Sequence, residues 1–190
     1  MNEGTSVAGA MLIVRPAVAA DVVRIASIYR EQVLNGAATF EIDPPDESEI
    51  ERRWRDVVAQ GCPWLVAAVD GRVIGYAYAN LYRTRAAYRY TAEDSIYIDA
   101  AHRRSGAGGR LLAALIAETT AGGFRQMVAV IGDSANAASI RLHERCGFSR
   151  VGLLSAVGYK FGRWIDSVLM QRSLGEGPAS APPELRRRGV

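Results

Sequence analysis

The sequence predicts an α/β (α+β) layer structure built on a mixed sheet. Two observations lead to this fold class. Four segments carry the apolar spacing or the end signals of helices, and apolar runs rich in strand-forming residues stand between them. The resulting order is β-α-α-β-β-β-α-β-α-β-β, which is typical of helices packed against a mixed sheet, and 190 residues suit one domain.

The chain opens with a short strand at residues 12–16, which ends in a proline. Asp21 then suits the N-cap of a helix. Apolar residues recur at helical spacing from Val22 to Val33, and Gly36 closes this first helix.

Two local signals support the elements that follow. Ser48 with Glu51 three residues later is a capping-box signature for the second helix. Asp70-Gly71 between two apolar runs is a hairpin turn. The later elements are expected as follows: a helix at 48–60, an antiparallel hairpin at 64–69 and 73–81, a strand at 95–98, a helix at 111–122, a strand at 127–131, a helix at 136–146, and strands at 149–154 and 164–172.

The expected single domain covers residues 11–174. Residues 1–10 are small and polar and are expected to be a disordered leader, while residues 175–190 hold three of the seven prolines and are expected to be a disordered tail. No stretch reaches about eighteen apolar residues, and no basic segment before an apolar run indicates a secretory signal. We therefore expect a cytoplasmic protein in which Cys62 and Cys146 are reduced packing residues and no metal is bound.

Arginines cluster on either side of the strand at 95–98, although the net charge is only +3. The clustered residues are Arg83, Arg85, Arg89, Arg103, Arg104 and Arg110. A nucleic-acid interface would interleave aromatic residues or present a base-reading helix, so the clusters favour a small anionic ligand. Lys160 is the only lysine in the chain.

The most specific local feature is the basic, glycine-rich turn at residues 103–109, which leads from a strand into a helix. Glycines let backbone amides point into one concavity, and a helix N-terminus adds positive potential, so a phosphate can sit there. The lysine of a Walker loop and the G-x-G-x-x-G of a dinucleotide fold are both absent. An ordinary strand-to-helix turn is the alternative.

Arg103-x-x-Gly106-x-Gly108 after a strand resembles the pyrophosphate loop of the GNAT superfamily of acyl-CoA-dependent N-acetyltransferases. The run from Asn136 to Phe148 is similar to the last-helix pattern of the same family. The resemblance implies a GNAT fold with a mixed, mostly antiparallel, twisted sheet flanked by helices on both faces, and acetyl-CoA as cosubstrate. It also implies these cofactor-binding residues: Ile96, Tyr97, Ile98, Arg103, Arg104, Ser105, Gly106, Ala107, Gly108, Gly109, Asn136 and Ser139.

Further motifs resemble one branch, the phosphinothricin and methionine sulfoximine N-acetyltransferases. They are Thr39-Phe40-Glu41, Arg83-x-Arg85, the run from Tyr88 to Tyr97, and Gly158-Tyr159-Lys160-Phe161-Gly162-Arg163-Trp164. The branch implies a homodimer that acetylates the α-amine of a small amino-acid analogue and binds neither nucleic acid nor membrane. The candidate substrate-binding residues are Phe40, Glu41, Arg83, Thr84, Arg85, Tyr90, Thr91, Glu93, Asp94, Ser95 and Lys160.

The implied reaction needs a base, because only an unprotonated amine attacks a thioester, and an acid for the departing thiolate. Glu93, just before the cofactor strand, is the favoured base, and a surface glutamate paired with an arginine is the alternative. His143 stands where many members of the superfamily carry tyrosine. Imidazole titrates near neutrality, so His143 is a candidate acid or a relay to Glu93, and a packed helical histidine is the alternative.

Arg83 and Arg85 are expected at the end of the hairpin strand, where alternation would place both on one face and Thr84 opposite. Guanidinium groups suit carboxylate and phosphinate oxygens, although a solvated sheet edge is the alternative. Phe40 and Tyr90 are candidates to wall the apolar stem of the acceptor. Lys160 suggests a place that a compact ammonium fits and a planar guanidinium does not.

Two other functions stay open. The first is that of a related acetyltransferase for another amino acid or small amine, because fold and cofactor do not determine the acceptor. A non-catalytic acyl-CoA-binding module on the same scaffold is the other, although Glu93, His143 and the arginine pair argue against it.

Overall fold

The computed structural model describes residues 11–182, and its elements follow the predicted order. They are β1 (Leu12–Pro16), α1 (Val22–Asn35), α2 (Glu47–Ala59), β2 (Trp64–Val69), β3 (Arg72–Leu81), β4 (Thr91–Ile98), α3 (Ala107–Ala121), β5 (Gln126–Gly132), α4 (Ala137–Arg145), β6 (Ser149–Lys160) and β7 (Arg163–Ser173). Short 3-10 turns stand between some of them. No helix in this described part is long and apolar enough to cross a membrane.

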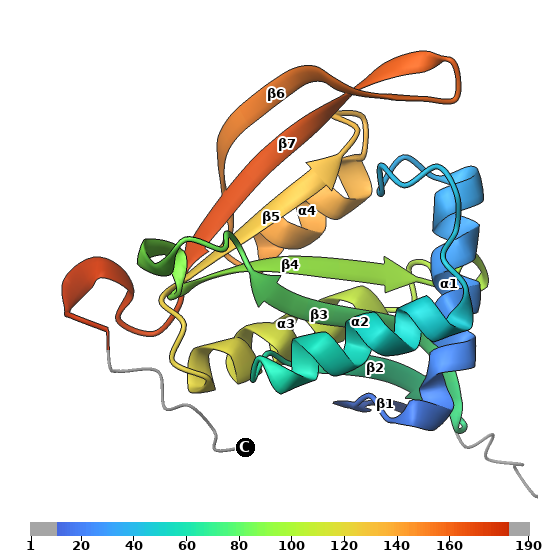
Figure 1. The fold of residues 1–190 in the computed structure, drawn as a ribbon, viewed down its shortest axis with the longest axis horizontal. Helices are drawn as coiled ribbons and strands as arrows, with labels where there is room; N and C mark the ends of the chain where they lie inside the picture. Colours follow the sequence, from blue (N-terminus) through green and yellow to red (C-terminus); the bar gives the residue numbers. More distant parts are fainter. Residues whose placement is uncertain (1–10, 183–190) are drawn as a thin grey trace, which may run out of the picture.

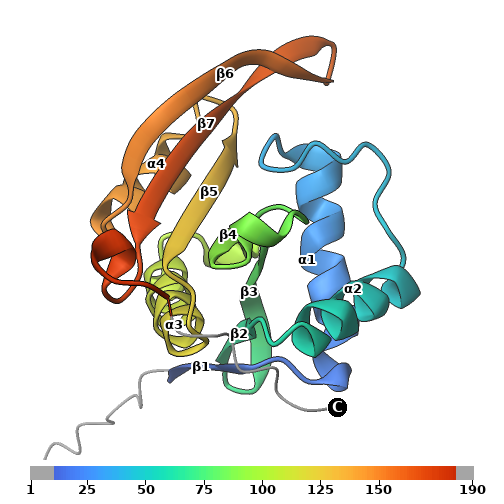
Figure 2. The ribbon, with the colours of Figure 1, turned by 60° about the vertical axis from the view of Figure 1, so that its left-hand side comes forward.

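The strands form one seven-stranded sheet in the order β1-β2-β3-β4-β5-β7-β6 (Figure 1). Every neighbouring pair is antiparallel except β4 and β5, which are parallel. Helices α1 and α2 cover one face, and α3 and α4 cover the other (Figure 2). This arrangement confirms the predicted mixed, mostly antiparallel sheet between two helical layers.

The two parallel strands stay together for only part of their length. Thr91 to Asp94 of β4 pair with Gln126 to Ala129 of β5. Beyond Asp94, β4 remains paired with β3 alone, and β5 remains paired with β7 alone. The sheet therefore opens between the ends of β4 and β5, and this opening sets the place of the site described below.

The core lies mainly between the sheet and its helices. Leu111, Leu112 and Leu115 on α3 are fully buried against the strands. Burying each such side chain contributes about 1.5–3 kcal/mol relative to leaving it exposed. On the other face, Tyr97 of β4 packs edge-on against Tyr29 of α1, with ring centroids 5.1 Å apart. Strand β4 is thus contacted by α1 on one face and by α3 on the other.

Strands β6 and β7 form a long hairpin that projects from the rest of the sheet (Figures 1 and 2). Its turn is Phe161-Gly162, and both residues have positive φ, 53° and 73°, as a two-residue primed turn requires. Strand β6 reaches Lys160, six residues beyond the predicted end. A register shift between Leu154 and Gly158 interrupts the alternation on which the prediction depended.

One predicted helix cap is right in position but not in bonding, and the other is wrong. Asp21 stands at the N-cap position of α1, but its carboxylate makes no cap bond there. It accepts the N–H of Val18 at 2.9 Å and pairs with Arg15 at 2.6 Å, at the 3-10 turn before the helix. Asp46, not Ser48, caps α2 by accepting the N–H of Glu49 at 2.8 Å, so this helix begins two residues before the position that the motif suggested.

The chain after β7 packs back on the domain over its first residues. Gly177–Ala179 form a 3-10 turn, and the N–H of Gly177 donates to the carbonyl of Leu174 at 2.9 Å. Arg125 donates to Oγ of Ser180 at 3.1 Å. Residues 175–182 of the expected tail thus have a described conformation, whereas the rest of that tail and the expected leader at 1–10 lie outside the described residues.

Candidate active site

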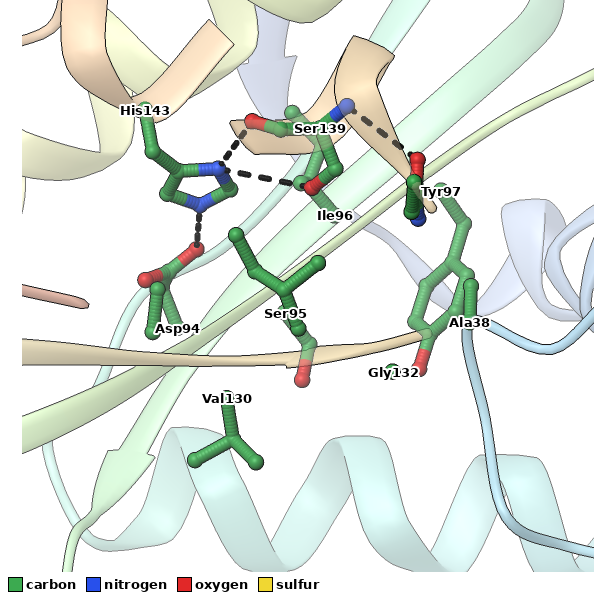
Figure 3. A pocket seen from close by; sticks show the side chains of 12 residues that line it. Ala38, Asp94, Ser95, Ile96, Tyr97, Val130, Gly132, Ser139 and His143 are labelled. Carbon is green, nitrogen blue, oxygen red and sulfur yellow. Dashed lines mark hydrogen bonds and ion pairs between the residues drawn. The ribbon is translucent and has the colours of Figure 1, made fainter. Parts of the chain in front are cut away.

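A pocket lies where β4 and β5 separate (Figure 3). Its lining comes from both strands, from α4 and from the segment after α1. The lining residues are Ala38, Asp94, Ser95, Ile96, Tyr97, Ala129, Val130, Ile131, Gly132, Asn136, Ser139 and His143. Seven of the predicted site residues are therefore brought to one place by the opening of the sheet.

Alternate residues of β4 face opposite sides of the sheet. Tyr97 faces α1, and Glu93 and Ser95 share its side by alternation. Asp94 faces α4, where it contacts His143. The two predicted catalytic residues, Glu93 and His143, therefore come from opposite faces of the sheet, and the carboxylate beside the imidazole is Asp94.

Glu93 is half-buried on the α1 side of β4. Burial raises the pKa of its carboxyl group, the positive charge of Arg83 opposes the rise, and the negative charge of Asp94 adds to it. A carboxylate with a raised pKa holds a proton more strongly than an ordinary glutamate, which suits a general base near neutral pH.

His143 is held at both ring nitrogens. Its Nδ1 lies 2.8 Å from the carbonyl oxygen of Ser139, and its Nε2 lies 3.0 Å from Oδ2 of Asp94 (Figure 3). Asn136 caps α4 by accepting the N–H of Ser139 at 3.2 Å. One run of hydrogen bonds thus links the start of α4 to β4.

The glycine-rich turn at 103–109 leads directly into α3. Arg104 and Gly106 have positive φ, 62° and 85°, and Gly106 provides no side-chain cap. The N–H of Ala107 donates to Oγ of Ser105 at 3.4 Å, and the next N–H groups lack acceptors within the helix and point out of its end. Asp99 fixes the base of the turn by pairing with Arg24 and accepting the N–H of Ala101. The exposed turn therefore fits an anion such as a pyrophosphate.

The acceptor-side arginines do not lie on a strand. Strand β3 ends at Leu81, so Arg83, Thr84 and Arg85 stand in the exposed loop before β4. The predicted alternation of these residues on a strand is wrong, because the chain leaves the ladder two residues earlier. Arg83 is still close enough to lower the pKa of Glu93.

Loop 36–41, between α1 and α2, packs against the end of β5 and against β6. The ring of Phe40 lies directly on Gly158 of β6, and the carbonyl of Ala37 lies directly on Gly132 of β5, so a β carbon at either glycine would overlap its neighbour. Lys160 donates from Nζ to the carbonyls of Gly36 at 2.9 Å and Thr39 at 3.0 Å.

Lys160 is only 4% exposed, so its ammonium group serves this loop and does not face open solvent. Glu41 at the end of the loop pairs with Arg53 of α2 at 2.6 Å. Sequence reasoning missed the roles of Arg53, Gly132 and Gly158. The sequence signals for this contact were the single lysine two residues after Gly158 and the two motifs that contain Phe40 and Gly158, but none of them showed that the two segments touch.

The strand, glycine-rich turn and helix on which the sequence resemblance depended are present as β4, residues 103–109 and α3. The model of the Acetyltransferase (GNAT) family matches residues 23–148. The chain belongs to this family. A phosphinothricin N-acetyltransferase from Alcaligenes faecalis is 49% identical over 162 residues, which are 85% of this chain and 82% of the relative.

Two further relatives agree with this membership. An L-methionine sulfoximine/L-methionine sulfone acetyltransferase from Pseudomonas aeruginosa is 42% identical over 171 residues, 89% of this chain and 98% of that one. The crystal structure of a GNAT superfamily phosphinothricin acetyltransferase from Sinorhizobium meliloti in complex with AcCoA is 50% identical. It has a TM-score of 0.89 and matches 91% of this chain and 94% of its own. The predicted family is confirmed, and proteins named as members of the predicted branch are among those similar to this chain.

Proposed function

We propose that this chain transfers the acetyl group of acetyl-CoA to the α-amine of a small amino-acid analogue, such as methionine sulfoximine, methionine sulfone or phosphinothricin. The observation that supports this function most is the opening between β4 and β5, with Glu93 on one strand and a free phosphate-type turn after it. The names of the similar proteins support the acceptor class.

The residues around the opening suit acetyl-CoA chemically. The ends of β4 leave backbone N–H and C=O groups unpaired toward β5, which can bind an amide-containing arm. Arg103 to Gly109 would hold the pyrophosphate, and Asn136 and Ser139 lie at the start of α4 on the same side. Bound acetyl-CoA would supply the thioester carbonyl that the amine attacks.

Glu93 would take the proton of the acceptor amine, directly or through a water molecule. Its raised pKa supports that role. Arg83 and Arg85 would bind the acidic groups of the acceptor, since both stand in an exposed loop and Arg83 is close enough to Glu93 to lower its pKa. We also assign Phe40 and Tyr90 to the walls around its apolar stem, and Glu41, Thr84, Thr91 and Ser95 to its polar contacts.

The test is a thiol-release assay with acetyl-CoA and a panel of amino acids and analogues. We expect turnover with methionine sulfoximine, methionine sulfone or phosphinothricin well above that with ordinary amino acids. Preference for another amine would replace the acceptor and keep the reaction. Acetyl-CoA binding without turnover on any acceptor would contradict the enzyme assignment and favour the binding module.

We also propose that the protein is a homodimer joined through the β6–β7 hairpin. This hairpin exposes large apolar side chains along one edge of the sheet: Val151, Leu153, Leu154, Val157, Tyr159, Phe161 and Trp164. Strand β6 is the last strand of the sheet, so its outer backbone groups are unpaired in the sheet. Such an edge, apolar and long, is suited to burial against a second copy.

A cytoplasmic location completes the proposal. The enzyme would work where acetyl-CoA is available, and Cys62 and Cys146 are both free thiols.

A further inference from the structure

The position of the His143 protons follows from the atoms around its ring. The carbonyl oxygen of Ser139 can only accept a hydrogen bond, so Nδ1 of His143 carries a proton and donates it. The bond between Nε2 and Oδ2 of Asp94 needs one further proton between the two atoms. Neither ring nitrogen is then free to donate to a third group such as a thiolate.

The pair is closed off from water. The side chains of His143 and Asp94 are 2% and 1% exposed. Oδ1 of Asp94 has no hydrogen-bond partner within the described part of the chain, so the imidazole is the main group that compensates this carboxylate. Burial alone would lower the pKa of His143, but the Asp94 carboxylate and the Ser139 carbonyl outweigh it and raise that pKa. The protonated form of the ring is therefore more favoured in this pair than in a free histidine.

Only Ser139 and Asp94 bond to the His143 ring within the described part of the chain, although the charge of Asp94 also raises the pKa of Cys146 and Glu93. Cys146 lies one turn further along α4, and Arg172 of β7 donates to the carbonyl of Cys146. Phe148 packs edge-on against the His143 ring, with centroids 5.0 Å apart. Glu93, the neighbour of Asp94 on β4, faces the other side of the sheet.

The pair also lies where strands β4 and β5 separate. Asp94 is the last residue of β4 that pairs with β5. His143 reaches it from α4, whose first turn is capped by Asn136. The hydrogen bonds from Asn136 through Ser139 and His143 to Asp94 tie α4 to β4 where the strands part. Figure 3 shows the bonds of His143 with Ser139 and Asp94.

We propose that His143 is a positioning residue and not the acid for the thiolate. As an imidazolium paired with Asp94, it holds the start of α4 against β4 and so sets the geometry of the cofactor side of the opening. What binds there rests on the proposed function, whereas the protonation of the pair does not.

The first test is ¹⁵N NMR of the imidazole nitrogens between pH 6 and 9. His102 is the only other histidine, so His102→Gln assigns the signals. We expect both nitrogens of His143 to stay protonated above pH 6.5, the ordinary pKa of histidine. In Asp94→Asn, the amide can donate to Nε2, so we expect a neutral ring protonated at Nδ1 alone. Titration of wild-type His143 near pH 6.5, with one nitrogen free, would overturn the proposal.

The second test separates positioning from acid catalysis by kinetics. We expect Asp94→Ala and His143→Ala to raise the KM for acetyl-CoA by about tenfold to a hundredfold, because small misplacements are costly. The double variant should be no worse than either single one, since both remove the same bond. Asp94→Asn should recover much of what Asp94→Ala loses, because it keeps a hydrogen bond to the ring.

An acid role gives a different result. His143→Ala would then lower kcat, change the alkaline limb of the pH profile and leave the KM for acetyl-CoA unchanged, and this pattern would refute the positioning role. Circular dichroism and Tm identify any variant that fails to fold. If the wild-type protein acetylates no acceptor, the proposed function fails, and the NMR titration still decides the state of His143.

Discussion

The ring of Phe40 lies directly on the α carbon of Gly158, and a β carbon at position 158 would overlap two of the ring atoms. Non-bonded carbon atoms need about 3.5–4.0 Å between them. Phe40 can therefore hold its place in loop 36–41 only because residue 158 has no side chain.

Gly158→Ala is expected to displace Phe40 and raise the KM for the acceptor by about tenfold, a typical effect of altering one apolar wall of a pocket. The KM for acetyl-CoA should change little. Gly152→Ala in the same strand is the control, because its β carbon would lie at an ordinary 3.6 Å from Leu169. Steady-state kinetics with both substrates check this, and equal acceptor KM values in the two variants would contradict it.

Lys160 offers a second way to release the same loop. Lys160→Met leaves the buried carbonyls of Gly36 and Thr39 without their donor, which costs about 1–3 kcal/mol for each unsatisfied group. We expect a lower Tm and a higher acceptor KM. Lys160→Arg should also raise the acceptor KM, because a planar guanidinium does not fit between two carbonyls placed for an ammonium. Wild-type kinetics in Lys160→Arg would disprove this fit.

Glu93→Gln is expected to lower kcat by about a hundredfold or more, since general-base catalysis contributes about 10²–10⁴-fold. Acetyl-CoA binding, measured by calorimetry, should persist. The base acts when deprotonated, so kcat/KM should fall below a pKa that lies above the ordinary 4.5 of glutamate.

Arg83→Gln removes the positive charge that lowers the pKa of Glu93, so the acid limb should move to higher pH. The pH profile of kcat/KM measures this shift. A limb that stays in place in Arg83→Gln and persists in Glu93→Gln would assign the titration to another group.

The imidazolium of His143 makes part of the stability depend on pH. Its pKa in the folded protein is raised above 6.5, so the stabilisation is fully present below about pH 6.5 and is lost as the pH rises through the folded-state pKa. We expect the Tm difference between wild type and Asp94→Asn to be largest near pH 6 and to shrink toward pH 9. Scanning calorimetry across this range measures it, and a difference that grows with pH would be the wrong sign.

The exposed side chains of the β6–β7 hairpin predict the oligomeric state. Leu153→Arg with Trp164→Arg should convert a dimer into a monomer, because it places two charges within an apolar contact. Sedimentation velocity compares the two forms. Val23→Arg on α1, an exposed apolar residue away from the hairpin, is the control and should leave the dimer intact.

Most of the architecture could be predicted because periodicity reports which side of an element is buried. The helical spacing from Val22 to Val33 and the Asp70-Gly71 turn both correspond to observed elements. Prediction failed where the chain departs from regular alternation. The bulge before Gly158 concealed half of β6, and the end of β3 at Leu81 removed the arginine pair from its expected strand.

The candidate site shows the same division. The turn at 103–109 and Asn136 depend on local chemistry, and the sequence contains that chemistry in one stretch. The partner of His143 is 49 residues away along the chain, and its side of the sheet depends on how β4 packs. No motif of neighbouring residues indicates such a contact, and the same holds for the contact between Phe40 and Gly158.

The contacts of loop 36–41 with Gly132, Gly158 and Lys160 have a consequence for protein engineering. A loop transferred here from another enzyme would have to fit closely against Gly132 and Gly158. It would also have to present two carbonyl groups to the ammonium of Lys160. The acceptor specificity of a related enzyme should therefore be transferable to this protein only when the loop and the residues at these three positions are exchanged together.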